Sequence, residues 1–181
     1  DTAQGSIFYG FYDVGLRLSG TEVTTPVTDW RWTDAIRWVQ VETYPWYKIP
    51  YHVTVDLGRD IDTNMLYLHS SYRGPTATNS GRDMRQDLGA ARAWNRHVLR
   101  DPRMRFKMWG DDRIFRSTVA LVTDPAEYER ARQAFHMKIR QGAGLCPPEG
   151  TDPPPCGQEK QKPEDRSRTY YFRVTPEFSG N

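Results

Sequence analysis

The chain predicts a mainly β fold with two or three helices, an α+β protein built on an antiparallel β-barrel. Three observations carry this prediction. Short segments rich in β-branched and aromatic residues recur along the chain and are joined by polar turns of hairpin length. Helical periodicity is confined to two segments, and the 181 residues fit one domain of ordinary size. Aromatic residues make up 13% of the chain, so rings are expected to build much of the core.

The first half of the barrel is predicted between residues 35 and 71. Residues 35–43 have the β-branched and aromatic content of a strand. Residues 51–57 and 64–71 flank the polar sequence GRDIDT, which predicts a β-hairpin. Residues 71–89 follow as a long polar loop, and loops of this length inside a compact domain are usually functional or mobile.

The second half is predicted as helix, hairpin, helix and strand. Residues 90–102 have helical spacing and end at Asp101-Pro102. Residues 104–110 and 114–123 form a second hairpin across a GDDR turn. Residues 124–142 begin with Asp124 as an N-cap and Pro125 in the first turn, which predicts a helix. Residues 169–176 are expected to close the sheet.

The domain boundaries follow from composition. Residues 1–30 are expected to form an aromatic arm that lies on the domain or on a partner, with a first strand of the barrel as the alternative. Residues 31–141 and 168–176 form the barrel domain. Residues 142–167 form a proline-rich insertion that holds both cysteines, Cys146 and Cys156. A stiff, exposed loop offers no core to hide a thiol, so a disulfide is the simplest interpretation, with two free thiols as the alternative.

Charge, hydropathy and cysteine content limit the partners and the location that we expect for this protein. The formal net charge is +2, from 25 basic and 23 acidic residues that are intermixed, so nucleic acid is not an expected partner. No window approaches the roughly 20 apolar residues of a membrane span. Because disulfides persist outside the reducing cytosol, we expect an exported protein, periplasmic or on the extracellular face. The four histidines and two cysteines lack metal-ligand spacing, so no metal site is expected.

Residues 66–135 resemble the FMN-binding split-barrel superfamily, specifically its deazaflavin-dependent nitroreductase branch. The resemblance is carried by a strand that ends in two serines, by a short helix with Trp94-Asn95, and by the strand pair and Thr-Asp-Pro helix start that follow. It implies an antiparallel split β-barrel that holds an isoalloxazine-like ring. In that family a basic, Gly-rich turn between the first two strands binds the cofactor's phosphate.

The matching turn in this chain departs from the family pattern. Residues 43–52 contain no Gly or Ser, and Lys48 is their only basic residue. The cofactor-binding residues that the resemblance implies are therefore Lys48, Ser70, Ser71 and Arg73, and the cofactor would be FMN or a deazaflavin. No catalytic residue is predicted, since no acyl-transfer, P-loop or dinucleotide motif is present.

Two functions are expected, in this order. The first is an extracytoplasmic accessory subunit without a cofactor, which binds a protein partner such as a membrane-bound respiratory or photosynthetic electron-transfer complex. The second is a flavin- or deazaflavin-dependent reductase of quinones or nitro compounds. Trp38, Trp94 and Trp109 are expected to fill the barrel. The residues expected to contact a partner are Phe8, Tyr9, Phe11, Tyr12, Trp30, Trp32 and Trp46.

Overall fold

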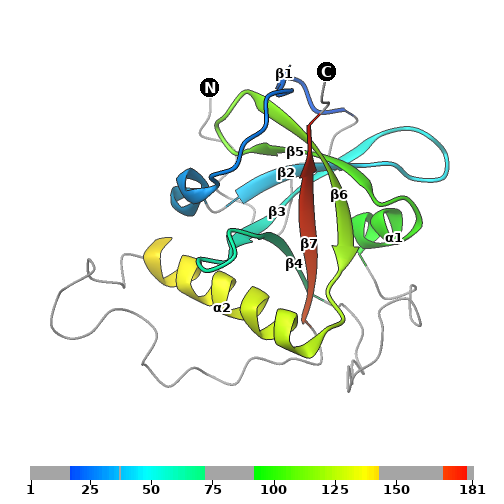
Figure 1. Ribbon diagram of the computed structural model, residues 1–181. Coiled ribbons are helices and arrows are strands. Elements are labelled where there is room, and N and C mark those ends of the chain that lie inside the picture. Colours follow the sequence, from blue (N-terminus) through cyan, green and yellow to red (C-terminus); the bar gives the residue numbers. More distant parts are fainter. Residues whose placement is uncertain (1–16, 37, 72–91, 143–168, 179–181) are drawn as a thin grey trace, which may run out of the picture.

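A computed structural model describes residues 17–36, 38–71, 92–142 and 169–178 (Figure 1). The elements follow one another as strands, a 3₁₀ helix η1 and two α-helices. In chain order they are β1 (Thr21–Glu22), η1 (Arg31–Ala35), β2 (Trp38–Thr43), β3 (Tyr51–Arg59), β4 (Leu66–Ser71), α1 (Ala93–Arg100), β5 (Arg103–Met108), β6 (Arg113–Leu121), α2 (Pro125–Gly142) and β7 (Thr169–Glu177).

Six of the strands close into an antiparallel barrel in the order β2, β3, β4, β7, β6, β5. The strand β7 completes the barrel because it pairs with both β4 and β6, opposing Phe172 to Leu68 and to Leu121. The short β1 lies outside the ring of strands and runs parallel to β6. The architecture is therefore the α+β split barrel that the sequence predicts.

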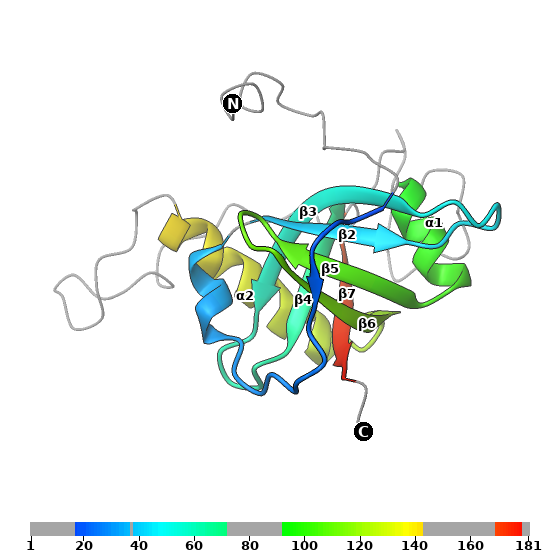
Figure 2. The same cartoon turned by 90° about the horizontal axis from the view of Figure 1, so that it is seen from above.

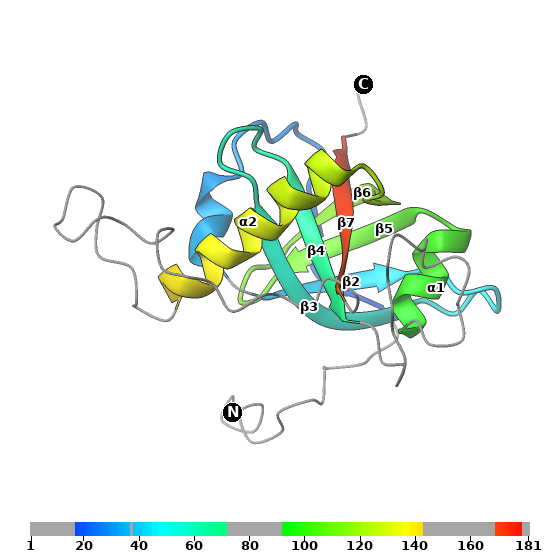
Figure 3. The same ribbon diagram turned by 90° about the horizontal axis from the view of Figure 1, so that it is seen from below.

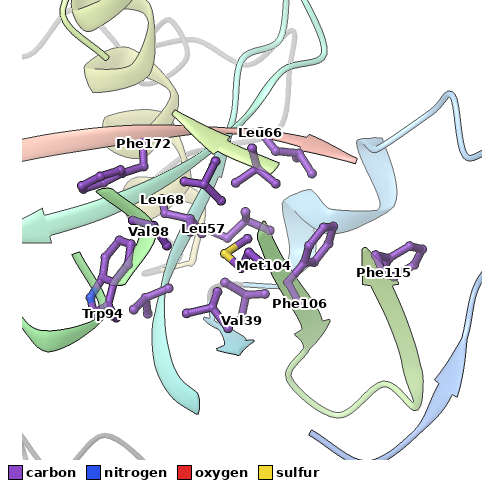
Figure 4. Close-up of a cluster of buried hydrophobic side chains, with 14 of the residues drawn as sticks. Val39, Leu57, Leu66, Leu68, Trp94, Val98, Met104, Phe106, Phe115 and Phe172 are labelled. Atoms are coloured by element: carbon purple, nitrogen blue, oxygen red, sulfur yellow. The ribbon is translucent and has the colours of Figure 1, made fainter. Parts of the chain in front are cut away.

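The barrel interior is filled by alternate residues of each strand, because successive side chains point to opposite faces. Val39 and Val41 from β2, for example, are fully buried. Figure 4 shows aliphatic side chains meeting the rings of Trp94, Phe106 and Phe172 in this core. Rings from several strands thus supply much of the packing, as the aromatic composition predicts.

The helices cover the ends and one face of the barrel. In Figures 1 and 2, η1 and α1 lie at opposite ends. Trp94 from α1 and Trp30 before η1 both reach the main core. Figure 3 shows α2 lying across β3 and β4, where Phe135 approaches so closely that a Cβ on Gly58 would lie 2.8 Å from its ring. Any residue larger than Gly at position 58 would displace the Phe135 ring or the helix that carries it.

The predicted hairpins and helices are confirmed. Asp124 caps α2 by accepting a 2.7 Å hydrogen bond from the Glu127 backbone N–H. The 3₁₀ helix η1 was not predicted. Two expectations about tryptophan are wrong: Trp38 and Trp109 are about half exposed and pack edge to face on each other, because their positions at a strand start and a turn lie outside the barrel.

The described part of the predicted arm, residues 17–30, lies on the barrel. We call residues 17–23 the strap. Leu18 donates its backbone N–H to Glu42, and its carbonyl accepts a hydrogen bond from Arg105. The Glu42 and Arg105 side chains form an ion pair at 2.6 Å that is almost entirely buried.

The predicted disulfide and four of the predicted partner-binding rings cannot be placed. Cys146 and Cys156 lie outside the described residues, as do Phe8, Tyr9, Phe11 and Tyr12. Among the described helices, none combines the length and apolar character required to cross a membrane.

Candidate functional site

The strands β3 and β4 separate along part of their length, which leaves a seam in the barrel wall. These two strands pair only through Leu57–Arg59 and Leu66–Leu68. Beyond that point β3 stays paired with β2, and β4 stays paired with β7. Residues 53–56 and 69–71 therefore have no ladder partner on each other's strand, and the start of α1 lies beside this opening.

The seam contains a cavity of about 120 Å³. Thr54 and Asp56 line it from β3, His69 from β4, and Arg92 and Trp94 from the start of α1. Thr54 is 8% exposed, and its hydroxyl has no hydrogen-bond partner among the described residues. A buried, unpaired hydroxyl is costly unless water or a ligand satisfies it, so the seam has unused capacity for a small polar group.

A larger hollow lies at the other end of α1, between that helix and the β2–β3 turn. Its volume is about 500 Å³, within the size range of small-molecule sites. We call it the basic hollow. Its lining residues are Tyr44, Pro45, Trp46, Lys48, Arg100, Asp101, Pro102 and Arg103.

Two cations of the basic hollow have no anionic partner among the described residues. Lys48 and Arg100 are both exposed and form no ion pair there, whereas Arg103 is held by Asp101 at 2.6 Å. Lys48 occupies the left-handed region with φ of 60°, and its N–H donates to the Pro45 carbonyl at 3.0 Å. The turn thus holds Lys48 in a strained backbone conformation, and within the described part of the chain no carboxylate pairs with its ammonium.

Aromatic side chains form the other wall of the basic hollow. Trp46 is 75% exposed and packs edge to face on Tyr47. The Arg103 guanidinium lies 5.5 Å from the centre of the Tyr44 ring. Such rings can stack on a planar ligand, and the cations beside them can neutralise an anionic group of that ligand.

His97 joins α1 to the strands below the hollow. Its Nδ1 lies 2.9 Å from the Thr43 hydroxyl, and its ring packs edge to face on Tyr51. Burial lowers the pKa of His97 below its ordinary value, and the positive charges of Arg96 and Arg100 lower the pKa further. The neutral imidazole is therefore favoured, and the positive charge of the hollow comes from lysine and arginine.

The predicted cofactor residues are not all brought together. Lys48 lines the basic hollow. Ser70 is 2% exposed inside the barrel, where it accepts a 2.6 Å hydrogen bond from the Asn95 amide, so it does not line the basic hollow and its role as a cofactor ligand stays a prediction. Ser71 ends β4 at the seam, and Arg73 lies outside the described residues.

The predicted partner-binding tryptophans differ in their exposure to solvent. Trp30 is 5% exposed and meets Phe115 at 5.2 Å between ring centres, so this side chain cannot form a docking surface. Trp32 is half-buried beneath the Arg113 guanidinium, which lies 4.3 Å from its ring centre. Trp46 alone of the three is an exposed ring.

Sequence reasoning missed Arg100. It lies 52 positions after Lys48, and only the packing of α1 under the β2–β3 turn brings both to one hollow. Its place in the last turn of α1 is a usual one for a basic residue, which gives no sign of a binding site. Within the described ranges, no group of three or more His, Cys, Asp or Glu side chains could hold a metal ion.

No protein-family model matches the chain, and no curated protein is similar in sequence. Solved structures of related shape do exist. One is described as a pyridoxamine 5′-phosphate oxidase-related, FMN-binding protein from Nostoc punctiforme, which is 14% identical with a TM-score of 0.44 over 84% of this chain and 83% of that one. Another is an F420 reductase, 14% identical with a TM-score of 0.45 over 84% of this chain and 96% of that one.

A third structure belongs to a protein of unknown function from Agrobacterium tumefaciens. It is 13% identical with a TM-score of 0.45, and the match covers 78% of this chain but 48% of that one, so the chain spans about half the length of that protein. At these identities and scores the likenesses assign neither cofactor nor activity to this chain. The split-barrel fold rests on its own strand order, and the deazaflavin-dependent nitroreductase branch stays a prediction.

Proposed function

We propose that the protein binds a phosphate-bearing flavin or deazaflavin in the basic hollow and acts as a reductase of quinones or nitro compounds. One observation carries the proposal. Lys48 and Arg100, two cations without an anionic partner among the described residues, lie around a hollow of about 500 Å³ beside the exposed ring of Trp46. A ligand that is both planar and anionic satisfies these features together.

The charges fit a phosphate group. Lys48 and Arg100 would contact it, and Arg103 can add a hydrogen bond without leaving Asp101, because a guanidinium carries five N–H donors. The Trp46 indole supplies a flat, exposed surface for an aromatic ring. The hollow therefore offers cations for the phosphate of a flavin mononucleotide and an aromatic surface for its ring.

The backbone of the β2–β3 turn fits less well than the side chains do. Pro45 and Pro50 have no N–H to offer, and the N–H of Lys48 is already used by the Pro45 carbonyl. Phosphate would be held by side-chain charge instead of a cradle of backbone N–H groups. We therefore expect an affinity that falls steeply with added salt.

The chemistry of such a reductase comes from the cofactor, whose ring would exchange a hydride with the acceptor. The residues of this chain would bind and orient the cofactor and exclude water. His97, kept neutral beneath the hollow, would leave the site's charge unchanged through the neutral pH range.

A docking function is the second candidate. Trp38 and Trp109 form an exposed ring pair on the outside of the barrel, and exposed tryptophans are typical of protein-binding surfaces. We infer that an exported accessory subunit of an electron-transfer complex would use this pair. Co-purification from the native source with a larger complex, lost in a variant with Trp38→Ser and Trp109→Ser, would support it.

The test of the first proposal is a titration with FMN and with a deazaflavin mononucleotide. We expect Lys48→Gly and Arg100→Gln each to weaken binding at least about tenfold, since hydrogen bonds to charged groups contribute about 1.5–3 kcal/mol. Arg96→Gln is the matched control, because Arg96 is exposed on α1 but does not line the hollow. Absence of binding by the unaltered protein at millimolar cofactor would exclude the proposal.

A further inference from the structure

The strap crosses the barrel toward the basic hollow. Going backward along the chain, the Ser19 carbonyl accepts a hydrogen bond from Lys107, and Leu18 is bonded to Glu42 and Arg105. These contacts move along β2 toward Tyr44, two residues beyond Glu42. Figure 2 shows the dark blue strap running over β2 and β5 toward the side of the barrel where α1 lies.

Arg17, the first described residue, continues this direction. Its neighbour Leu18 is bonded to Glu42, and Tyr44 lies two residues beyond Glu42 along the chain. Tyr44 lines the hollow. Two residues of extended strand span about 7 Å, so the chain before Leu18 starts within about that distance of the hollow.

The 16 residues that precede the strap have the composition to fill the hollow. They carry four aromatic rings between positions 8 and 12. Their charged side chains are Asp1 and Asp13, and they contain no Lys or Arg. The hollow is cationic and lined by rings, so charge and apolar character are both complementary.

The segment is also long enough. Tyr12 lies six residues before Leu18, and six extended residues reach about 20 Å. The anchor is firm, because the Leu18 backbone is held by two hydrogen bonds to a buried ion pair. A fixed anchor near the hollow raises the effective concentration of the rings there.

We propose that the aromatic segment, residues 8–13, docks in the basic hollow of its own chain, with its rings against Trp46 and Asp13 facing Lys48 and Arg100. The docking itself does not depend on the proposed function. The consequence for a cofactor does: an incoming flavin would have to displace the segment.

The test follows the Trp46 indole N–H by NMR, assigned with Trp46→Phe. A full-length variant with Phe8, Tyr9, Phe11 and Tyr12 all changed to Ser should shift this resonance and make the indole more accessible to acrylamide. Removal of residues 1–6, which carry no ring, is the matched control. It should change neither the Trp46 resonance nor the accessibility of the indole to acrylamide. An unshifted Trp46 in the four-serine variant would overturn the proposal.

Two further measurements separate the alternatives. The Trp46 resonance of the unaltered protein and of the four-serine variant is compared at decreasing concentration. If the difference vanished on dilution and sedimentation showed a dimer, the segment would dock on a second copy. The proposal for docking within one chain would then be wrong. With FMN, the four-serine variant should bind at least about twofold more tightly, because an occluded site loses affinity in proportion to its open fraction. A Trp46 shift with no FMN binding by either protein would sustain the docking and refute the cofactor proposal.

Discussion

The two covered faces of the barrel are held in different ways. Across β3, β4 and β7 the cover is α2, which packs Phe135 and Ala131 against Tyr67 and Tyr171. Across β2, β5 and β6 the cover is the strap, held by polar bonds around the Glu42–Arg105 pair. Apolar burial is spread over many atoms, whereas the strap depends on a few directional bonds. Stability should therefore be far more sensitive to one substitution under the strap than to one on the helix surface.

The largest expected effect is from Glu42→Gln. The substitution leaves Arg105 buried without its counter-ion and removes a carboxylate acceptor from the Leu18 N–H. Breaking a buried pair in this way costs about 3–5 kcal/mol of unfolding free energy, measured by urea denaturation. Glu129→Gln is the control, because its ion pair with Arg132 is a part-buried pair three residues apart on one helix, and the expected change is under about 1 kcal/mol. Equal effects would remove the contrast between the two faces.

Gly58→Ala tests the apolar cover. A Cβ at position 58 would lie 2.8 Å from the Phe135 ring, so the ring or α2 has to shift. Overpacking of this kind costs about 1–3 kcal/mol. Adding Phe135→Leu should recover part of the loss in the same denaturation experiment. A double variant less stable than the sum of the two single changes would show that the ring does not cause the strain.

Asp124→Ala should have a smaller effect on the same cover. It removes the 2.7 Å cap of the Glu127 N–H and should cost about 1 kcal/mol. Asp124→Ser retains a capping oxygen and should stay close to the unaltered protein in thermal melting. If serine were no better than alanine, capping would not be what Asp124 contributes.

The smallest expected effect belongs to neither face. His97 has a lowered pKa in the folded protein because of burial and the charges of Arg96 and Arg100. The unfolded chain, with a pKa of about 6.5, then binds more protons in mild acid, so stability falls as the pH drops below about 6.5. His97→Gln should flatten this part of the stability profile against pH. An unchanged slope would assign the acid sensitivity to another group.

Local sequence patterns predicted most of the fold. The Asp124-Pro125 start and the hairpin turns are determined by a few adjacent residues, so a single sequence is enough to find them. The side on which Ser70 lies was also predictable, since Leu66, Leu68 and Ser70 alternate along β4 and share the buried face. The same alternation places Ser70 on the core side of β4, where its hydroxyl accepts the Asn95 hydrogen bond, and its role as a cofactor ligand stays a prediction.

The site was less predictable because distant residues form it. Trp30 and Trp46 have similar polar, proline-containing surroundings in the sequence, yet one is buried and the other exposed. What separates them is the path of the chain from the strap to η1, which carries Trp30 into the core. Lys48 and Arg100 meet only after α1 has packed at the end of the barrel.

Barrel closure by β7 has a consequence for synthesis of the protein. During translation, the edges of β4 and β6 exist before residues 169–177 have left the ribosome, and both edges wait for the same strand. Unpaired strand edges pair readily with other chains. A nascent chain stalled before β7 is therefore expected to be more prone to aggregation than the complete chain.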